Sequence, residues 1–127
     1  MFLKVTRESD GISLAGRVGI ADSFWTRFRG LMLRETLPPG EGLMIEGCTS
    51  IHMMFMRFPI DALFLDSSNT AVGLYQSLRP WTGISGWHRN ASRVLELPAE
   101  TLHRFSVAVG DRFHLEEVHE DSAQKGC

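Results

Sequence analysis

The sequence predicts one mainly β domain of the α+β class, a small antiparallel β-barrel or sandwich of six to seven short strands. Short apolar segments rich in β-branched residues recur between Gly, Pro, Asn and Asp turn signals. One stretch, residues 22–33, instead has apolar residues at helical spacing. The length of 127 residues is close to the commonest domain size. We therefore expect one compact domain over residues 1–118 and a polar, disordered tail over 119–127.

The N-terminal part predicts a hairpin followed by this helix. Apolar and β-branched residues on both sides of Ser9-Asp10-Gly11 indicate two strands, FLKV and ISLAGRVGIA, joined by a turn. From residue 22 the apolar side chains fall on one helical face: Phe24, Trp25, Phe28, Leu31 and Met32. Asp22 can act as the N-cap of the helix, because its carboxylate can accept hydrogen bonds from the first free amides.

Residues 43–66 are the apolar centre of the sequence. Both parities of the run Ile51 to Phe58 are mostly apolar, a pattern typical of strands buried on both faces. Pro59 cannot donate to a ladder, so it is predicted to divide a strand IHMMFMRF from a second strand IDALFLD. The polar side chains of His52, Arg57 and Asp61 are embedded in this segment. A functional site is expected to lie next to this segment.

The C-terminal part predicts three further strands and a short helical turn. Residues 66–69 form a hairpin turn before the strand TAVGLYQSL, and the strands RVLELPA and RFHLEEV follow. Residues 79–92 form a long connection that contains two glycines and a proline. A second helical turn is expected near residues 99–105, because Pro98 is tolerated where a helix begins.

Composition excludes several classes of protein and supplies no partner. The 13 basic and 15 acidic residues give a formal charge of −2, too little to hold the chain on nucleic acid or an anionic membrane. No window approaches the roughly 18 consecutive apolar residues of a membrane span. The segment MFLKVTRESDG also lacks the apolar run of a signal peptide. We expect a cytoplasmic protein with Cys48 and Cys127 as thiols, no membrane association and no nucleic-acid partner.

Four blocks of the sequence resemble a known family. They are RFRGLM at 27–32, GEGLMIEGCTSIHMMFMRFPIDALFLD at 40–66, VLELPAE at 94–100 and VGD at 109–111. In order and spacing they are similar to the bacterial and archaeal domain-of-unknown-function family 192, over roughly residues 12–118. The resemblance implies a compact β-rich domain with a short helix near the N-terminus. It implies no activity, because the family is uncharacterised.

A catalytic site is one hypothesis for the apolar centre. Cys48, Ser50 and His52 alternate, so on a strand their side chains would share one face. A hydrolase or transferase could use Cys48 or Asp61 with His52, the histidine acting as base. Residues 48 and 52 would, however, be too far apart on a regular strand for a direct hydrogen bond. A buried cysteine and a hydrogen-bonded histidine are favoured, and the chain is interpreted as more typical of a binding protein than of an enzyme.

Metal binding is a further hypothesis for the same residues. Cys48 and His52 would need His88 or His103 from elsewhere, and Met44, Met54 or Met56 would suit Cu(I). Ligands this widely spaced form no recognised motif. We therefore expect neither a metal nor another cofactor.

Arg57 and Asp61 flank the segment Phe58-Pro59-Ile60. An isolated charge in so apolar a region is costly to bury, so we expect both groups to be paired or hydrogen-bonded. Asp61 is predicted to accept backbone amides near the bend, with Arg57 neutralising it or reaching solvent. Ligand binding by Arg57 is the alternative.

The connection 79–92 is the candidate recognition segment. It carries aromatic and cationic side chains: Arg79, Trp81, Trp87, His88 and Arg89. Stacking combined with ion pairing suits an anionic ligand, whereas two tryptophans could instead pin the loop as a lid.

These observations favour a small binding or accessory module. It would recognise a small anionic or polar ligand, or a protein, at a concave face near Cys48, His52, Asp61 and residues 79–89. Arg57 and the aromatic and cationic residues of the connection are the predicted ligand-binding residues. A further alternative is a protein-interaction domain without a small-molecule site, using apolar surface around Met53 to Phe55.

Overall fold

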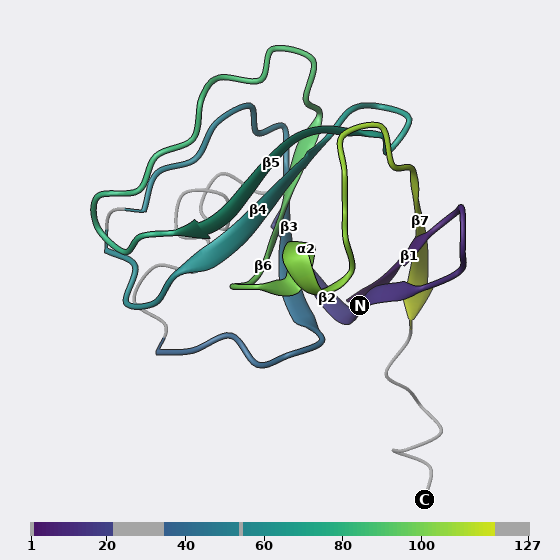
Figure 1. The fold of residues 1–127 in the computed structure, drawn as a ribbon, viewed down its shortest axis with the longest axis horizontal. Coiled ribbons are helices and arrows are strands. Elements are labelled where there is room, and N and C mark those ends of the chain that lie inside the picture. Colours follow the sequence, from purple (N-terminus) through teal and green to yellow (C-terminus); the bar gives the residue numbers. More distant parts are fainter. Residues whose placement is uncertain (1, 22–34, 54, 119–127) are drawn as a thin grey trace, which may run out of the picture.

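The computed structural model describes residues 2–21, 35–53 and 55–118. Its elements are β1 (Phe2–Arg7), β2 (Ser13–Ala21), β3 (Glu41–Glu46), β4 (Ile60–Leu65), β5 (Ala71–Leu78), β6 (Arg93–Pro98), α2 (Thr101–Arg104) and β7 (Phe113–Val118) (Figure 1). The helical turn expected near 99–105 is therefore confirmed as α2. The helix predicted at 22–33, with its cap at Asp22, and the tail at 119–127 lie outside the described residues.

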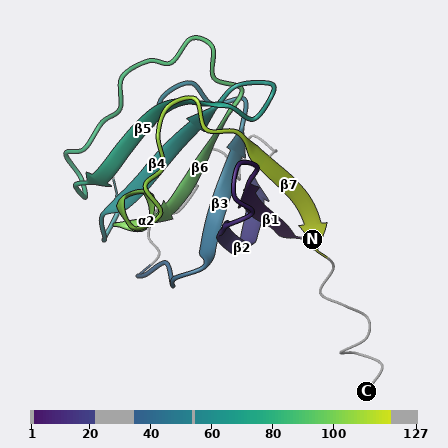
Figure 2. The ribbon, with the colours of Figure 1, turned by 45° about the vertical axis from the view of Figure 1, so that its right-hand side comes forward.

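The strands form one seven-stranded sheet in the order β5-β4-β6-β3-β2-β1-β7. This confirms the mainly β class, but two details of the prediction are wrong. β2 and β3 pair in parallel, so the sheet is mixed and not antiparallel. The sheet also curls without closing into a barrel, because the outermost strands, β5 and β7, are not ladder neighbours (Figure 2). A bridge between Thr70 and Arg112 joins the chain just before each of these strands.

The described core lies on both sides of the sheet. One cluster, which we call the inner core, fills the curl and joins the two ends of the sheet; it includes Val5, Leu63, Leu95, Leu102 and Phe113. A second cluster, the outer core, covers the other face of β3, β4 and β6; it includes Ile45, Met53, Ile60, Phe64 and Val94. All six residues of β4 are buried. This confirms the strand IDALFLD expected after Pro59.

The other strand predicted in the apolar centre, over residues 51–58, is wrong. His52 makes a single bridge to Ile84, and the described residues around it form no ladder. The backbone turns here, since Met56 N donates to Met53 O at 3.1 Å and Phe55 has φ of 65°. Ile51, Met53 and Met56 bury their side chains in the outer core. The apolar run therefore covers the sheet instead of belonging to it.

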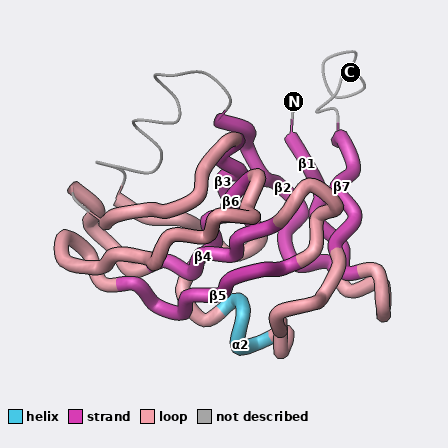
Figure 3. Tube along the Cα trace, turned by 90° about the horizontal axis from the view of Figure 1, so that it is seen from above, coloured by secondary structure: helices cyan, strands magenta, loops and turns pink. Residues whose placement is uncertain are grey.

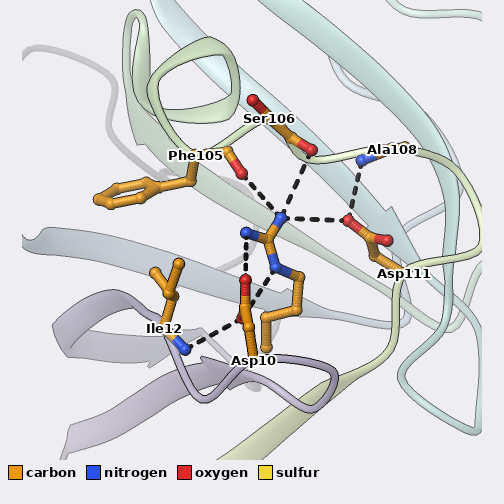
Figure 4. A network of polar contacts seen from close by, with 7 residues as sticks. Asp10, Ile12, Phe105, Ser106, Ala108 and Asp111 are labelled. Carbon is orange, nitrogen blue, oxygen red and sulfur yellow. Dashed lines mark hydrogen bonds and ion pairs between the residues drawn. The ribbon is translucent and has the colours of Figure 1, made fainter.

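Arg7 clamps the β1–β2 hairpin to the segment that connects α2 with β7 (Figure 4). Its guanidinium donates to both Asp10 oxygens at 3.2 and 2.9 Å, to Phe105 O at 2.7 Å and to Asp111 Oδ2 at 3.3 Å. Asp111 Oδ2 also accepts from Ala108 N at 3.0 Å. The hydrogen bond from Arg7 lowers the pKa of the Asp10 carboxyl, which the backbone amide of Ile12 lowers further.

Replacing Arg7 with glutamine is expected to lower the free energy of unfolding by about 2 kcal/mol, because charge-assisted hydrogen bonds to two carboxylates and a carbonyl are lost. The pKa of Asp10 is depressed in the fold, so its contribution is present at neutral pH and is lost as the pH falls through that depressed value. The difference in the free energy of unfolding between Arg7→Gln and the natural chain should therefore be smaller at acidic pH. Urea unfolding at neutral and acidic pH measures this. Arg112→Gln, at an exposed arginine whose side chain donates to Ser68 O, is the control and should change stability little; an equal loss in both variants would contradict the clamp.

No helix in the described ranges is long and apolar enough to cross a membrane.

Candidate functional site

Two loops, residues 47–59 and 79–92, lie side by side over the outer core (Figure 3). Backbone hydrogen bonds join them in antiparallel fashion: Met53 N to Gly83 O at 2.9 Å, Trp81 N to Met53 O at 2.8 Å, Ser85 N to Ile51 O at 3.0 Å and His88 N to Thr49 O at 2.8 Å. The buried Ser85 hydroxyl adds a bond from Ile51 N at 2.9 Å. The two loops therefore form one joined surface.

Tyr75 and His88 seat the longer loop on the sheet. The Tyr75 hydroxyl accepts from Gly86 N at 2.8 Å and lies 2.7 Å from His88 Nε2. The His88 ring packs on Phe64, with ring centroids 4.6 Å apart. It also lies directly over Gly73, where a Cβ would come within 2.5 Å of the ring. His88, predicted as a ligand-binding residue, thus anchors the loop.

Replacing Tyr75 with phenylalanine is expected to destabilise the chain by about 1–2 kcal/mol, because two hydrogen-bonding groups lose their partner while the ring remains. The effect should be local, so the amide of Gly86 should exchange with solvent faster in the variant. Hydrogen exchange followed by NMR measures this. Amides of β1 are the reference. An unchanged exchange rate of the Gly86 amide in the variant would contradict the role of Tyr75 in holding the loop on the sheet.

Four large apolar side chains on the joined loops face solvent; we call them the aromatic patch. They are Phe55, Trp81, Ile84 and Trp87, with 46%, 56%, 70% and 72% of their surface exposed. The rings of Phe55 and Trp81 meet edge to face, with centroids 5.1 Å apart. Trp87 Nε1 donates to Thr49 Oγ1 at 2.9 Å, which fixes the indole without burying it. Two exposed tryptophans held in place are typical of a contact surface.

The backbone at the patch is strained. Phe55 and Trp81 have φ of 65° and 68°, in the left-handed region that bulky residues rarely adopt. The hydrogen bonds between the loops hold Trp81 in this conformation, since its amide is bonded to Met53 O. Strain of this kind costs about 1–3 kcal/mol per residue and gathers at functional sites.

The charged side chains of the two loops are basic and none is acidic. Neither loop contains Asp or Glu, although the chain has 15 acidic residues and a net charge of −2. Three exposed arginines lie on the loops: Arg57, Arg79 and Arg89. Arg89 lies 5.7 Å from the Trp87 ring centroid. Arg57 lies 3.8 Å from Glu35, and because both side chains are exposed this pair contributes little. The aromatic patch therefore has a cationic rim.

The predicted catalytic residues lie on different sides of the sheet. Asp61 is fully buried on the inner-core side, where its oxygens accept from the amides of Ser77, Glu100 and Leu102 at 2.8, 3.2 and 2.8 Å. Cys48 packs against the outer core and its Sγ donates to Ser50 O at 3.0 Å, while the His52 side chain is exposed. Asp61 is therefore not brought together with Cys48 and His52. As predicted, Asp61 accepts hydrogen bonds from backbone amides. Arg57 pairs with Glu35 and not with Asp61.

Sequence reasoning missed Glu96, a buried carboxyl at the centre of β6. Its cross-strand neighbours are Leu43 and Ala62, so its side chain points to the outer-core face. Only 6% of the residue is exposed, and Oε1 has no hydrogen-bond partner among the described residues. Burial raises the pKa of Glu96 to about 7. The signal was present in the run Val94 to Leu97, where a single charge interrupts a strand that is apolar at both parities.

Metal-ligating side chains do not converge within the described part of the chain. No three of the His, Cys, Asp and Glu residues there are placed to hold an ion.

Comparison with known proteins finds matches along most of the chain. The family model DUF192, described as an uncharacterised ACR, matches residues 5–115. A UPF0127 protein of Thermococcus sibiricus is 38% identical over 112 residues, covering 85% of this chain and 71% of the relative. A UPF0127 protein of Pyrococcus abyssi is 36% identical over 114 residues, covering 85% and 93%.

Two solved structures share the fold. A protein of Sinorhizobium meliloti described as a putative transcription regulator superposes with a TM-score of 0.77 at 28% identity, covering 89% of this chain and 91% of that one. A protein of unknown function from Novosphingobium aromaticivorans has a TM-score of 0.74 at 20% identity, covering 88% and 82%.

Proposed function

This chain belongs to the uncharacterised DUF192 family, and we propose that it is a recognition module whose aromatic patch binds a protein partner rich in acidic side chains. The observation that carries the proposal is the combination on two joined loops of four exposed apolar side chains with arginines and no acidic residue. Aromatic residues and arginine are the residues most enriched in protein interfaces and at their energetic centres.

Exposure favours a protein over a small ligand. A small-molecule site buries most of its ligand in a cavity. Ile84 and Trp87 instead have 70% and 72% of their surface open to solvent. Covering such side chains needs a broad partner, and the cationic rim favours an acidic one. The small anionic or polar ligand expected from the sequence is thus the less favoured occupant of this surface.

The backbone bonds between the loops supply preorganisation. The Trp81 backbone is bonded to Met53 and its ring contacts Phe55, while the Trp87 indole is bonded to Thr49. Binding would therefore order few further side chains. Preorganisation of this kind increases affinity by lowering the entropy lost on association. Asp61 cannot supply a third catalytic group, because its oxygens already hold three backbone amides on the other side of β4. This weighs against the hydrolase or transferase hypothesis.

A displayed library of random peptides tests the proposal with a defined probe. Selection on the natural chain should enrich peptides in which Asp or Glu stands beside apolar residues. Binding of these peptides should weaken at least about tenfold in a Trp81→Ala, Trp87→Ala variant. It should also weaken, with a shallower salt dependence, in an Arg79→Gln, Arg89→Gln variant.

Val109→Ser is the matched control, since Val109 is an apolar side chain 63% exposed outside the two loops. It should bind the selected peptides as the natural chain does. Selected peptides without acidic residues, or equal binding by the tryptophan variant, would overturn the proposal. A short single-stranded oligonucleotide is the second probe. If it binds and the peptides do not, and the arginine variant abolishes that binding, the surface recognises nucleic acid and the protein partner is wrong.

A further inference from the structure

A concave feature lies at the opposite end of β3 and β6 from the two loops. The 47–59 loop follows the end of β3 and the 79–92 loop precedes the start of β6. The feature is a cleft of about 200 Å³ between the start of β2, the turn at Pro39-Gly40 and the end of β6 with α2. The cleft and the aromatic patch therefore lie at opposite ends of β3 and β6.

The lining of the cleft combines polar and apolar surface with one cation. Leu14, Pro39, Pro98 and Phe105 supply apolar surface. Arg104, in the last turn of α2, also lines it, and within the described ranges its guanidinium makes no hydrogen bond or ion pair. Arg7, which donates to Phe105 O at 2.7 Å, is by contrast paired with two carboxylates. Arg104 is thus an available donor beside a partly apolar hollow.

Hydrogen bonds within the walls fix the shape of the cleft. Gly16 N and Arg17 N both donate to Gly40 O at 3.0 Å, which ties the start of β2 to the turn before β3. On the opposite wall Thr101 Oγ1 donates to Pro98 O at 2.7 Å, and Asp61 holds Leu102 N at 2.8 Å. Ser13 and Thr101 are the polar uncharged side chains among the lining residues. The site is therefore built before any ligand enters.

We infer that this cleft binds a small monocarboxylate with an apolar body. Arginine forms paired hydrogen bonds with a carboxylate, and Phe105 and the two prolines can contact the apolar part. A single cation does not match a phosphate dianion, which draws on several charged donors. A volume of about 200 Å³ is below the 300–1,000 Å³ of drug-sized sites, so the ligand is small.

Benzoate, with benzyl alcohol as its neutral counterpart, is the probe. Titration followed by backbone amide NMR should shift Ala15, Thr101 and Phe105 with benzoate and much less with the alcohol. Arg104→Gln should weaken benzoate binding at least about tenfold, the loss of one charge-assisted pair. This arginine is exposed, so the variant should keep the fold, which its amide spectrum verifies.

Arg89→Gln is the control and separates this cleft from the proposed function, because it alters the aromatic patch and leaves the cleft intact. Benzoate binding unchanged in Arg89→Gln and lost in Arg104→Gln supports the inference whatever the peptide selection gives. Equal shifts with benzoate and benzyl alcohol, equal benzoate affinity in Arg104→Gln, shifts confined to residues 79–92, or tighter binding of inorganic phosphate would each overturn it.

Discussion

Replacing Asp61 with alanine is expected to lower the free energy of unfolding by about 4 kcal/mol, because three backbone amides, of which that of Leu102 is buried, lose their acceptor at once. The carboxylate is fully buried, and its bonds to Ser77, Glu100 and Leu102 join β4 to the end of β5 and to α2. Asp61→Asn should lose about half as much, since the amide keeps one acceptor oxygen but turns a donor toward one of the three amides.

Urea unfolding of both variants measures this, with Asp66→Ala as the matched control. Asp66 Oδ1 also accepts two backbone amides, those of Ser68 and Thr70 at 2.8 and 3.0 Å, but in a partly exposed hairpin turn. The control should cost about 1 kcal/mol. If Asp61→Ala is no more destabilising than the control, the structural role assigned to Asp61 is wrong. The Asp61 carboxylate would then be available for a catalytic role.

Stability is expected to fall by about 3 kcal/mol as the pH rises from 4.5 to 7, and the cause is Glu96. Burial raises its pKa from the ordinary 4.5 to about 7. Below pH 4.5 the carboxyl is protonated in both the folded and unfolded chain and contributes no pH dependence. Between these values the folded chain binds the extra proton, so the free energy of unfolding decreases with pH. Above pH 7 both states are ionised and the loss is complete.

Glu96→Gln should remove this dependence, because the amide is neutral at every pH. Unfolding by urea at pH 4, 5.5 and 8 measures it. The variant should be more stable than the natural chain at pH 8 and not at pH 4. Glu116→Gln, at an exposed position of β7, is the control and should leave the pH profile unchanged. A natural chain whose pH profile matches that of Glu96→Gln would show that the carboxyl is solvated or paired in solution.

Local pattern predicted the strands where burial and periodicity agree. Residues 60–65 were identified as the strand that follows Pro59 in the apolar centre, and all six are buried in β4. Apolar residues at both parities predicted another strand over residues 51–58, and this prediction failed, since a covering loop and a doubly buried strand both need apolar residues at every position. The parallel pairing of β2 with β3 was missed, although the long connection between them is what a parallel pair requires.

The candidate binding surface was predicted only in part, because local sequence patterns identified some of its residues and not others. Trp81, Trp87 and Arg89 were identified from the composition of a long connection, and they do lie on the exposed loop surface. The apolar surface expected around Met53 to Phe55 divides, with Met53 buried and Phe55 exposed. Ile84 was missed because a lone isoleucine in a loop gives no periodic signal. The neighbours of Asp61 were missed because they lie 16 to 41 residues away along the chain.

The aromatic patch as the binding surface is tested most directly by NMR mapping of a selected acidic peptide on the natural chain. Complex formation should shift the indole resonances of Trp81 and Trp87 and the amides of residues 47–53 and 79–92, with amides around the Arg104 cleft unchanged. Increasing salt should reverse the shifts, because the rim contributes through exposed arginines. Shifts confined to other residues, or a saturating peptide that leaves both indoles unmoved, would contradict the account.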